Sequence, residues 1–536
     1  MNKIVTIIFF SNFLGLFTTG IVGTNPIVNP GIVQDRRLSA LQKVISEHPQ
    51  SFSPSNGLSS EIKSTQTRAV VGPQIGTSFD PFTRFNGVIP MYGQSFPNAG
   101  SFGVGPTQIV TFSYYATRSF DKNGVADNIL DVSGMQFFSP VGTALPEAFL
   151  GDTISQFDHF SQRWFFVSNS NHPLGYTDPN FLYIAYSDGP IITELTKFTY
   201  YSFNVADIPP ASPSPTVLAD YPKMGIDSQA IYIGYDEFDN LDPFYSEAGL
   251  IVIPKAQLFA GAPVINVFRN LLAQYGTLFP TGVNNFDPNP EFGYAISGNL
   301  FTQSDLNLFT IINPASASPS LSVEFIPINP IQVFLALTGQ GAPQKGNLYG
   351  NNSLLEFLGA AINSAFIRDN HLFAAFDAAV DNTGNSNTPL ADREGILWFE
   401  LNLNTIPTSI SQNGVIFDPS DINPLWFIWA GIMGNTQGDL VIASSVTGAD
   451  SFVNMMVAGR KATDAPGVMS DPVFVTNSQA PLNMGPNPVF SFGQQRFGEQ
   501  TSVVLDPTDN LTMWAAAEWV AEQDNWASRI VEILPS

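Results

Sequence analysis

Residues 502–515, SVVLDPTDNLTMWA, contain the pattern that decides the fold. An apolar strand ends at Leu505, a polar turn runs from Asp506 to Asn510, and a second strand begins at Leu511. Aspartate, asparagine and proline favour tight turns, whereas β-branched and aromatic residues favour strands. The stretch therefore predicts a β-hairpin.

The same hairpin recurs along the chain, each time as a turn rich in Asp, Asn or Gly followed by an apolar or aromatic strand. The seven turns begin at Gly105, Asp158, Asp227, Asp287, Asp369, Asn435 and Asp506, and subtraction of residue numbers gives steps of 53 to 82 residues. This spacing leaves room for about four strands per unit. One hairpin repeated in this way is typical of a propeller, whose blades bury their faces by stacking around a ring.

We therefore predict an all-β fold, a single β-propeller of about seven four-stranded blades spanning residues 76–536. We expect the last strand, Trp526–Ile533, to share a blade with a segment near Phe82–Ile89 and so to close the ring. A large β-sandwich is the alternative, and it does not readily explain seven similar hairpins.

The N-terminus has the layout of a secretory signal. A basic start, Met1–Lys3, precedes an apolar run from Ile4 to Phe17 and then small residues up to Gly20. We predict a signal peptide over residues 1–20, with an uncleaved anchor as the alternative. Residues 21–75 form a polar linker or pro-segment with one short helix. Nothing else approaches the roughly 20 apolar residues of a membrane span.

Composition narrows the class of protein and of partner. Charged residues are 12%, the formal net charge is −24, and there is no cysteine among the 536 residues. Such acidity argues against nucleic-acid binding, which needs a Lys/Arg surface. A large all-β domain can fold outside the cytoplasm without disulfides. We expect a secreted or cell-surface monomer, with a protein or glycan as ligand.

Several short pieces carry a resemblance. They are VGPTQIV from Val104, FDKNG from Phe120, QFDHFSQRWF from Gln156, LYIAYS from Leu182, DYPKMG from Asp220, REGILWFEL from Arg393, the stretch Gly498–Trp519, and WASRI from Trp526. With these pieces the chain, from about Pro97 onward, resembles a family of bacterial secreted or surface β-propellers related in shape to the sialidase (BNR/Asp-box) superfamily. The family tends to have Gly-Asp-Tyr-Ser where this chain has Gly498-Glu-Gln-Thr. The resemblance implies a propeller outside the cytoplasm and no particular reaction.

Catalytic motifs are scarce. The histidines are His48, His159, His172 and His371, none of which pair at zinc-ligand spacing, and no Ser-His-Asp signature is present. A sialidase-like site would need an arginine cluster with carboxylates. Arg393, Arg460 and Arg496 are the candidates that could converge at the ring centre.

Two other groups are candidate binding residues. Asp236, Asp239 and Asp242 recur at intervals of three after a predicted strand and are a candidate Ca²⁺ site, with a solvated acidic loop as the alternative. Asp377, Asp381, Asn382 and Asn385 form a weaker copy. Trp426, Trp429 and Trp519 are candidate ligand-binding residues that can stack on a sugar or peptide, with packing between blades as the alternative.

These observations favour a non-catalytic propeller that presents loops to a protein or glycan. The alternative is a sialidase-like glycan-cleaving hydrolase with its site at the ring centre, where residues from several blades meet.

Overall fold

The computed structural model describes residues 71–535, apart from 84–100, 114–115, 142–148, 173–174, 243–244, 278, 329–340, 358, 360, 387, 389 and 485–493. The predicted signal peptide, the short helix over 36–47 and nearly all of the linker lie outside the described residues. The first described strand, β1, begins at Gln74, two residues before the expected start of the propeller.

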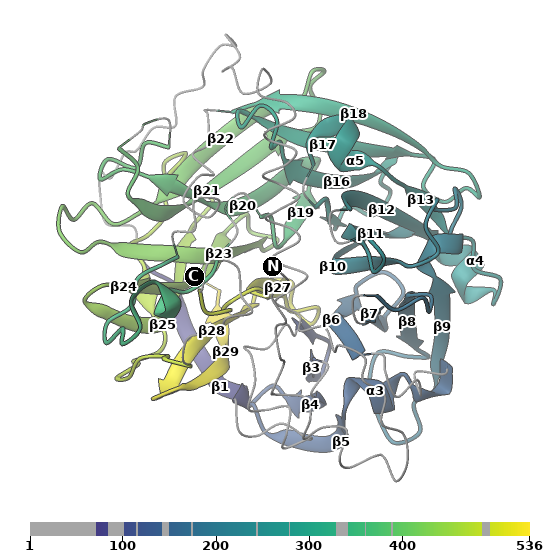
Figure 1. Cartoon of the computed structure of the whole chain (residues 1–536), viewed down its shortest axis with the longest axis horizontal. Helices are drawn as coiled ribbons and strands as arrows, with labels where there is room; N and C mark the ends of the chain where they lie inside the picture. Colours follow the sequence, from purple (N-terminus) through teal and green to yellow (C-terminus); the bar gives the residue numbers. More distant parts are fainter. Residues whose placement is uncertain are drawn as a thin grey trace, which may run out of the picture.

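The described strands form seven sheets arranged in a ring (Figure 1). Three blades in the first half of the ring are β2–β5 (Ser101–Val104, Gln108–Phe112, Thr117–Asp121, Ala126–Val132), β6–β9 (Phe149–Asp158, Arg163–Asn171, Phe181–Ser187, Phe198–Asn204) and β10–β13 (Val217–Ile226, Ala230–Asp239, Ser246–Pro254, Asn266–Phe268). The fourth is β14, β16, β17 and β18 (Thr281–Gly282, Phe292–Gly298, Asp305–Ile312, Ser320–Pro327).

The remaining blades follow in chain order. They are β15 with β19–β22 (Asn284–Asn285, Ala365–Arg368, His371–Val380, Arg393–Asn402, Ser409–Ile416), β23–β26 (Leu425–Gly434, Leu440–Gly448, Ser451–Arg460, Val473–Phe474), and β27–β29 with β1 (Ser502–Leu505, Met513–Glu522, Asn525–Leu534, Gln74–Thr83). Six sheets have four strands. The sheet of β15 and β19–β22 has five strands, because β15 pairs parallel to β19. The seven-bladed all-β prediction is confirmed.

Helices are few and short. The described ones are α3, α4 and α5 (Gly134–Phe137, Lys255–Phe259, Leu271–Tyr275) and the 3₁₀ turns η1, η2 and η3 (Ser139–Val141, Val205–Asp207, Gly350–Ser353). None of the helices in the described part is long and apolar enough to cross a membrane.

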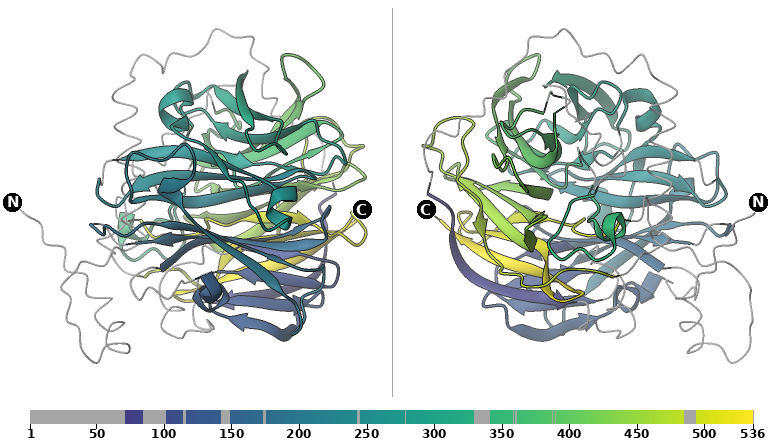
Figure 2. Two further views of the ribbon diagram at one scale, coloured as in Figure 1. Left: turned by 90° about the vertical axis from the view of Figure 1, so that its right-hand side faces the viewer. Right: turned by 60° about the vertical axis from the view of Figure 1, so that its left-hand side comes forward.

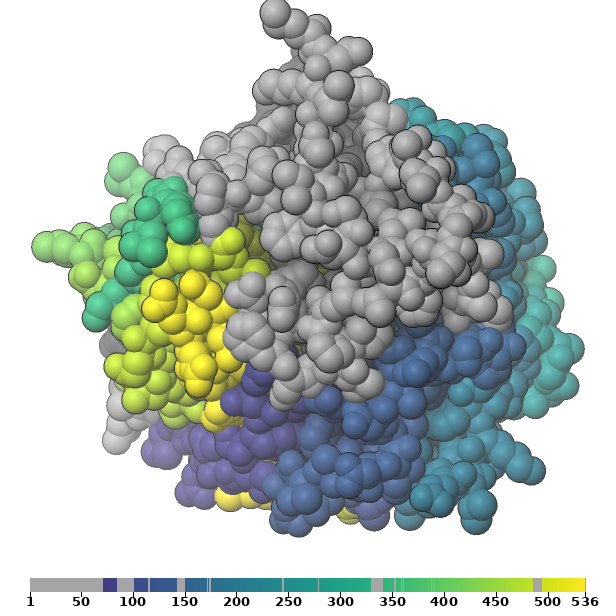
Figure 3. Space-filling view, turned by 60° about the horizontal axis from the view of Figure 1, so that its bottom comes forward, coloured from purple at the N-terminus to yellow at the C-terminus, as the bar shows by residue number. Residues whose placement is uncertain are grey.

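The ring closes where the two ends of the chain share a blade. β1 pairs antiparallel with β29, with Phe82 opposite Ser528 and Gln74 opposite Leu534. Figure 3 shows the purple residues of β1 beside the yellow C-terminal residues. The prediction that an N-terminal strand completes the last blade is therefore confirmed. That strand, β1, begins at Gln74, before the predicted segment Phe82–Ile89.

Five of the seven sequence-predicted turns join the innermost strand of a blade to its second strand. The turn at Asp287 leads from β15 to β16, and the turn at Asp369 joins β19 to β20. Their side chains hold the turn locally. Asp227 Oδ1 accepts hydrogen bonds from the backbone N–H groups of Gln229 (2.7 Å) and Ala230 (2.8 Å), and Asp506 Oδ1 accepts one from Thr508 (2.9 Å). Such capping explains why a polar residue recurs there. Strands run from one face of the ring to the other (Figure 2), so these turns share one face.

Candidate functional site

A cavity of about 100 Å³ lies on the ring axis, where the innermost strands of all seven blades meet. Its polar lining includes Ser101, Gln156, His159, Lys223, Asn284, Asn285, Asn363, Ser364, Gln500 and Ser502, and its apolar lining includes Phe102, Phe286, Met433 and Leu505. Because a water needs about 10–15 Å³ of such space, the cavity has room for several waters or for the end of a small polar ligand.

Lys223 organises one side of this cavity. Its ammonium lies 3.0 Å from Asn363 Oδ1, 3.3 Å from Gln500 Oε1 and 3.9 Å from the centre of the Tyr221 ring. The side chain comes from β10 at an irregular register, where Tyr221 has a φ of +53°. Bulges of this kind re-aim side chains. The local distortion of Asp220-Tyr-Pro-Lys thus brings a tyrosine and a lysine to the ring centre.

His159 and Phe286 mark another part of the lining. Their rings lie 5.1 Å apart in an edge-on arrangement. Burial lowers the pKa of His159 to about 4, with Asp158 opposing the shift, so the imidazole is neutral at pH 7. Nearby, Gln156 Nε2 donates to Asn284 Oδ1 (2.5 Å). The lining is therefore mostly uncharged hydrogen-bonding groups and aromatic rings, a combination that suits a polar ligand.

One carboxylate, Asp158, is found among the described lining residues. It is already engaged in structure. Its Oδ2 lies 2.5 Å from Lys255 Nζ, and its Oδ1 accepts a hydrogen bond from the Phe160 N–H (3.0 Å). Most glycosidases need a pair of carboxyl groups flanking the bond that breaks. The cavity presents no such pair among its described residues.

A second polar group, which we call the acidic cluster, consists of Arg496, Glu499, Asp152 and Glu356. The Arg496 guanidinium makes a bidentate pair with Glu499 (2.6 and 2.7 Å). Although burial opposes it, the negative charges of Glu499, Asp152 and Glu356 raise the pKa of Arg496. Tyr221 lies between the cluster and the cavity. Its hydroxyl is 2.8 Å from the backbone oxygen of Glu499 and 3.0 Å from Oδ1 of the lining residue Asn363.

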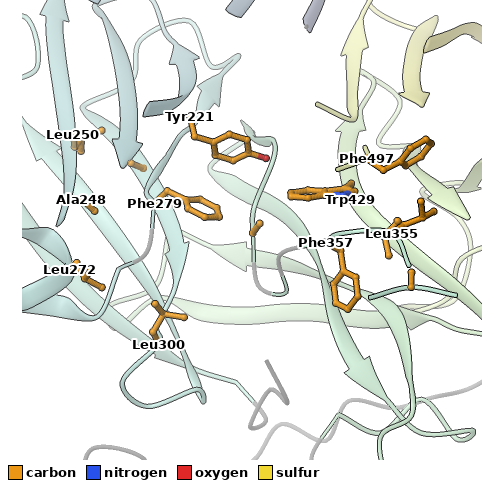
Figure 4. Packing of buried hydrophobic residues seen from close by; sticks show 14 of the residues in the cluster. Tyr221, Ala248, Leu250, Leu272, Phe279, Leu300, Leu355, Phe357, Trp429 and Phe497 are labelled. Carbon is orange, nitrogen blue, oxygen red and sulfur yellow. The ribbon is translucent and has the colours of Figure 1, made fainter. Parts of the chain in front are cut away.

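Aromatic side chains fill the space beside the acidic cluster. In Figure 4, Tyr221 and Phe279 extend from one side toward Trp429 and Phe357 on the other, and Phe497 lies beyond Trp429. The Trp429 indole N–H donates to the backbone oxygen of Glu356 (3.1 Å). All five rings are 2% exposed or less. This packing buries the acidic cluster in a hydrophobic core.

Asp377 and Glu394 form a buried carboxyl pair next to Trp429. They lie on the neighbouring strands β20 and β21, where Asp377 is opposite Ile396. Burial raises the pKa of Asp377 to about 7, and the backbone N–H groups of Ala430 and Trp429 oppose that shift. Burial and the charge of Asp377 raise the pKa of Glu394 well above its usual range. Neither residue lines the cavity.

The three predicted arginines do not converge. Arg393 donates to the backbone oxygens of Asp418 (2.6 Å) and Ser420 (2.5 Å) beside β21, and Arg460 donates to Gln412 Oε1 (2.7 Å). These three hydrogen bonds lie within or between blades, and neither Arg393 nor Arg460 lines the cavity. Only Arg496 meets carboxylates near the ring centre.

The three predicted ligand-binding tryptophans are buried at 7% (Trp426), 0% (Trp429) and 9% (Trp519) exposure. Trp426 packs against Phe357 with ring centres 6.0 Å apart, and Trp519 donates to Asp80 Oδ1 (3.1 Å) on the closing strand. All three tryptophans thus pack between strands or loops, as in the alternative of packing between blades. None of the three has an exposed indole face on which a ligand could stack.

The candidate Ca²⁺ residues are separated by the strand itself. Asp236 and Asp239 both lie in β11, where residues three apart point to opposite faces, and Asp239 Oδ1 accepts a hydrogen bond from Thr216 Oγ1 (2.5 Å). No group of three or more His, Asp or Glu side chains in the described part of the chain is placed to hold a metal. The interval of three suits a loop, whereas Asp236 and Asp239 lie in an extended strand and Asp242 follows its end. Melting with and without a chelator tests the Ca²⁺ hypothesis.

Sequence reasoning did not nominate Lys223, Asn363 or Gln500 as site residues. Two of them lie in pieces that carried the family resemblance, Asp220-Tyr-Pro-Lys and Gly498-Glu-Gln-Thr. Lys223 and Gln500 are 277 positions apart and meet only because the ring closes. The signal that could have pointed to Lys223 was a lysine in the mainly apolar stretch that precedes the turn at Asp227.

Comparisons with known proteins add solved structures only. No family model and no curated protein matches the chain. A subtype N11 neuraminidase-like protein of A/flat-faced bat/Peru is 12% identical, over 75% of this chain and 98% of its own, with a TM-score of 0.33. An α-L-arabinofuranosidase of Fusarium graminearum is 8% identical (85% and 98% covered, TM-score 0.35). An exo-β-1,3-galactanase from Phanerochaete chrysosporium is 10% identical (87% and 100% covered, TM-score 0.32).

Proposed function

We propose that this chain is a secreted or surface-displayed, non-catalytic β-propeller that binds a glycan through the cavity at the ring centre. The observation that carries the proposal is the chemistry of the lining. Amides, hydroxyls and aromatic rings line a space of about 100 Å³ where the seven blades meet, and the one described carboxylate there is held by Lys255 and a turn.

Amide side chains suit a sugar ligand because each one both donates and accepts hydrogen bonds. Gln156, Asn284, Asn363 and Gln500 place four amides around one small cavity. Phe102 and Phe286 add apolar surface that can pack against the C–H groups of a sugar ring. Location outside the cytoplasm is part of the proposal and is supported by the predicted signal over residues 1–20. N-terminal sequencing of the mature protein should begin near Ile21 or Thr24.

A glycan array combined with a panel of chromogenic glycosides tests the proposal. We expect retention of a subset of glycans without release of chromophore. Gln156→Leu should weaken retention, whereas Gln437→Leu, in an exposed turn between β23 and β24, should leave it unchanged. Retention of no glycan at all, or turnover that a cavity variant abolishes, would refute the proposed role.

A glycan-cleaving hydrolase is the second candidate, and one observation favours it. Arg496 is surrounded by three carboxylates, Glu499, Asp152 and Glu356, near the ring centre. If these groups were catalytic, Glu356→Gln would abolish turnover of a chromogenic glycoside while the fold was kept. Since the arginine is already held bidentately by Glu499, we favour a structural role for the cluster.

A further inference from the structure

Two amide groups of the cavity have a fixed orientation. Lys223 Nζ lies 3.0 Å from Asn363 Oδ1 and 3.3 Å from Gln500 Oε1. An ammonium group only donates hydrogen bonds, so each amide must turn its oxygen toward Lys223 and its NH₂ group away from it. Asn363 Oδ1 also lies 3.0 Å from the Tyr221 hydroxyl, which occupies this oxygen further.

The two NH₂ groups have no acceptor among the residues that the structure describes. Asn363 Nδ2, Gln500 Nε2 and the neighbouring Ser502 Oγ are buried and make no hydrogen bond to any described residue. Asn363 is 9% exposed, and all three residues line the cavity. A buried donor without an acceptor destabilises the protein, so a ligand that supplies an acceptor to each of these donors is favoured there.

This side of the cavity is therefore rich in donors and poor in free acceptors. A sugar hydroxyl brings both an acceptor and a proton that needs an acceptor of its own. A carboxylate brings only acceptors, about four lone-pair sites on two oxygens, and its hydrogen bonds are strengthened by charge. Lys223 also supplies a positive charge beside the two amides. Both the arrangement of hydrogen-bond donors and the positive charge of Lys223 favour a carboxylate as the ligand group.

We propose that Lys223, Asn363, Gln500 and Ser502 form a carboxylate-binding subsite, and that the glycan bound at the ring centre ends in an acidic sugar. This inference rests on the proposed glycan-binding function and adds the class of the terminal sugar. The amide N–H groups of Asn363 and Gln500 hold the carboxylate oxygens, and Lys223 acts as a positioning residue that fixes both amides.

Calorimetric titration with D-glucuronate, D-glucose and N-acetylglycine tests the subsite in the full chain. Glucuronate should bind at least tenfold more tightly than glucose, because only the carboxylate matches the donors. N-acetylglycine, which offers a carboxylate without a sugar ring, should bind more weakly than glucuronate. Equal or tighter binding of glucose, or equal binding of N-acetylglycine, would overturn the acidic-sugar assignment. So would no binding of glucuronate.

Gln500→Glu is the decisive variant. It replaces the free NH₂ group by a carboxylate oxygen and keeps an acceptor for Lys223, so the fold should be retained. We expect at least a tenfold loss of glucuronate binding. Gln437→Glu adds the same charge in an exposed turn and should bind as the native chain does. Undiminished binding by Gln500→Glu would overturn the subsite. Glycan retention on the array for neutral glycans alone would leave the proposed function intact and defeat only this inference.

Discussion

The cavity and the acidic cluster sit side by side at the ring centre and treat their polar groups in opposite ways. In the acidic cluster the charges face one another, since Arg496 is held by Glu499 at 2.6 and 2.7 Å inside an aromatic core. In the cavity, the amide N–H groups of Asn363 and Gln500 are without a hydrogen-bond acceptor among the described residues. The difference teaches that charge density alone does not mark a site. Unpaired hydrogen-bonding capacity beside a space is the stronger indication.

The largest effect should come from breaking the acidic cluster. Arg496→Ala leaves three carboxylates near one another in the core, and we expect the free energy of unfolding to fall by about 3–5 kcal/mol. Urea denaturation measures the change. Arg118→Ala removes an exposed pair with Asp131 and should cost under about 1 kcal/mol. Equal losses in both variants would contradict the structural role given to Arg496.

The buried carboxyl pair predicts how stability depends on pH. The pKa of Asp377 is about 7 in the folded chain, whereas an unfolded aspartate loses its proton near pH 4. Between these values the folded state binds more protons, so the free energy of unfolding should fall as pH rises from about 4 to 7, by on the order of 4 kcal/mol through Asp377. Glu394, whose pKa is also raised, should extend the fall to higher pH.

Asp377→Asn removes the titrating group and should flatten much of that fall, as denaturation at several pH values would reveal. Asp381→Asn, on the same blade but near the surface, is the matched control and should keep the full dependence. If the native chain became more stable between pH 4 and 7 through this group, the assigned direction of its pKa would be wrong.

The next prediction concerns the contribution of Lys223 to ligand binding in the cavity. Lys223→Met frees both amides to rotate and removes the positive charge, so ligand affinity should fall about tenfold or more, which is about 1.4 kcal/mol. Lys345→Met, where an exposed lysine packs over Phe452, should not change affinity. Titration of both variants with the same glycan is the measurement, and an unchanged affinity in Lys223→Met would count against the cavity.

The smallest effect should come from a tryptophan that sequence patterns made a binding candidate. Trp519→Phe removes one hydrogen bond to Asp80 while keeping the ring stacked near Arg529, so we expect a loss of about 1 kcal/mol in stability. Glycan retention should be unaffected. A stable Trp519→Phe variant that no longer retained glycan would show that a rim stacking site exists after all.

The fold was predictable because its signals are local. A turn such as Asp506–Asn510 is held by side chains of its own residues, so short-range sequence is enough to find it, and seven copies imply the ring. Trp164, Trp398 and Trp514 each lie in a strand that follows one of these turns or in the strand after it, and all three are fully buried.

The site was not predictable because it is assembled across the ring. Lys223 and Gln500 are 277 positions apart, and no local pattern brings them together. Spacing alone also does not give the element type: Asp236 and Asp239 suit one cation in a loop, and they point apart in β11. A tryptophan that follows a turn or flanks an acidic loop can lie at a rim or between blades, which is why Trp426, Trp429 and Trp519 were candidates.

A structure of the native chain bound to a glycan that the array retains is the most direct test of binding at the ring centre. We expect a sugar in the ring-centre cavity, with Asn363 Nδ2 and Gln500 Nε2 within hydrogen-bond distance of its acidic group. Every glycosidic bond should be intact. A sugar seated against Glu356 and Glu499, or a cleaved product in either place, would contradict it.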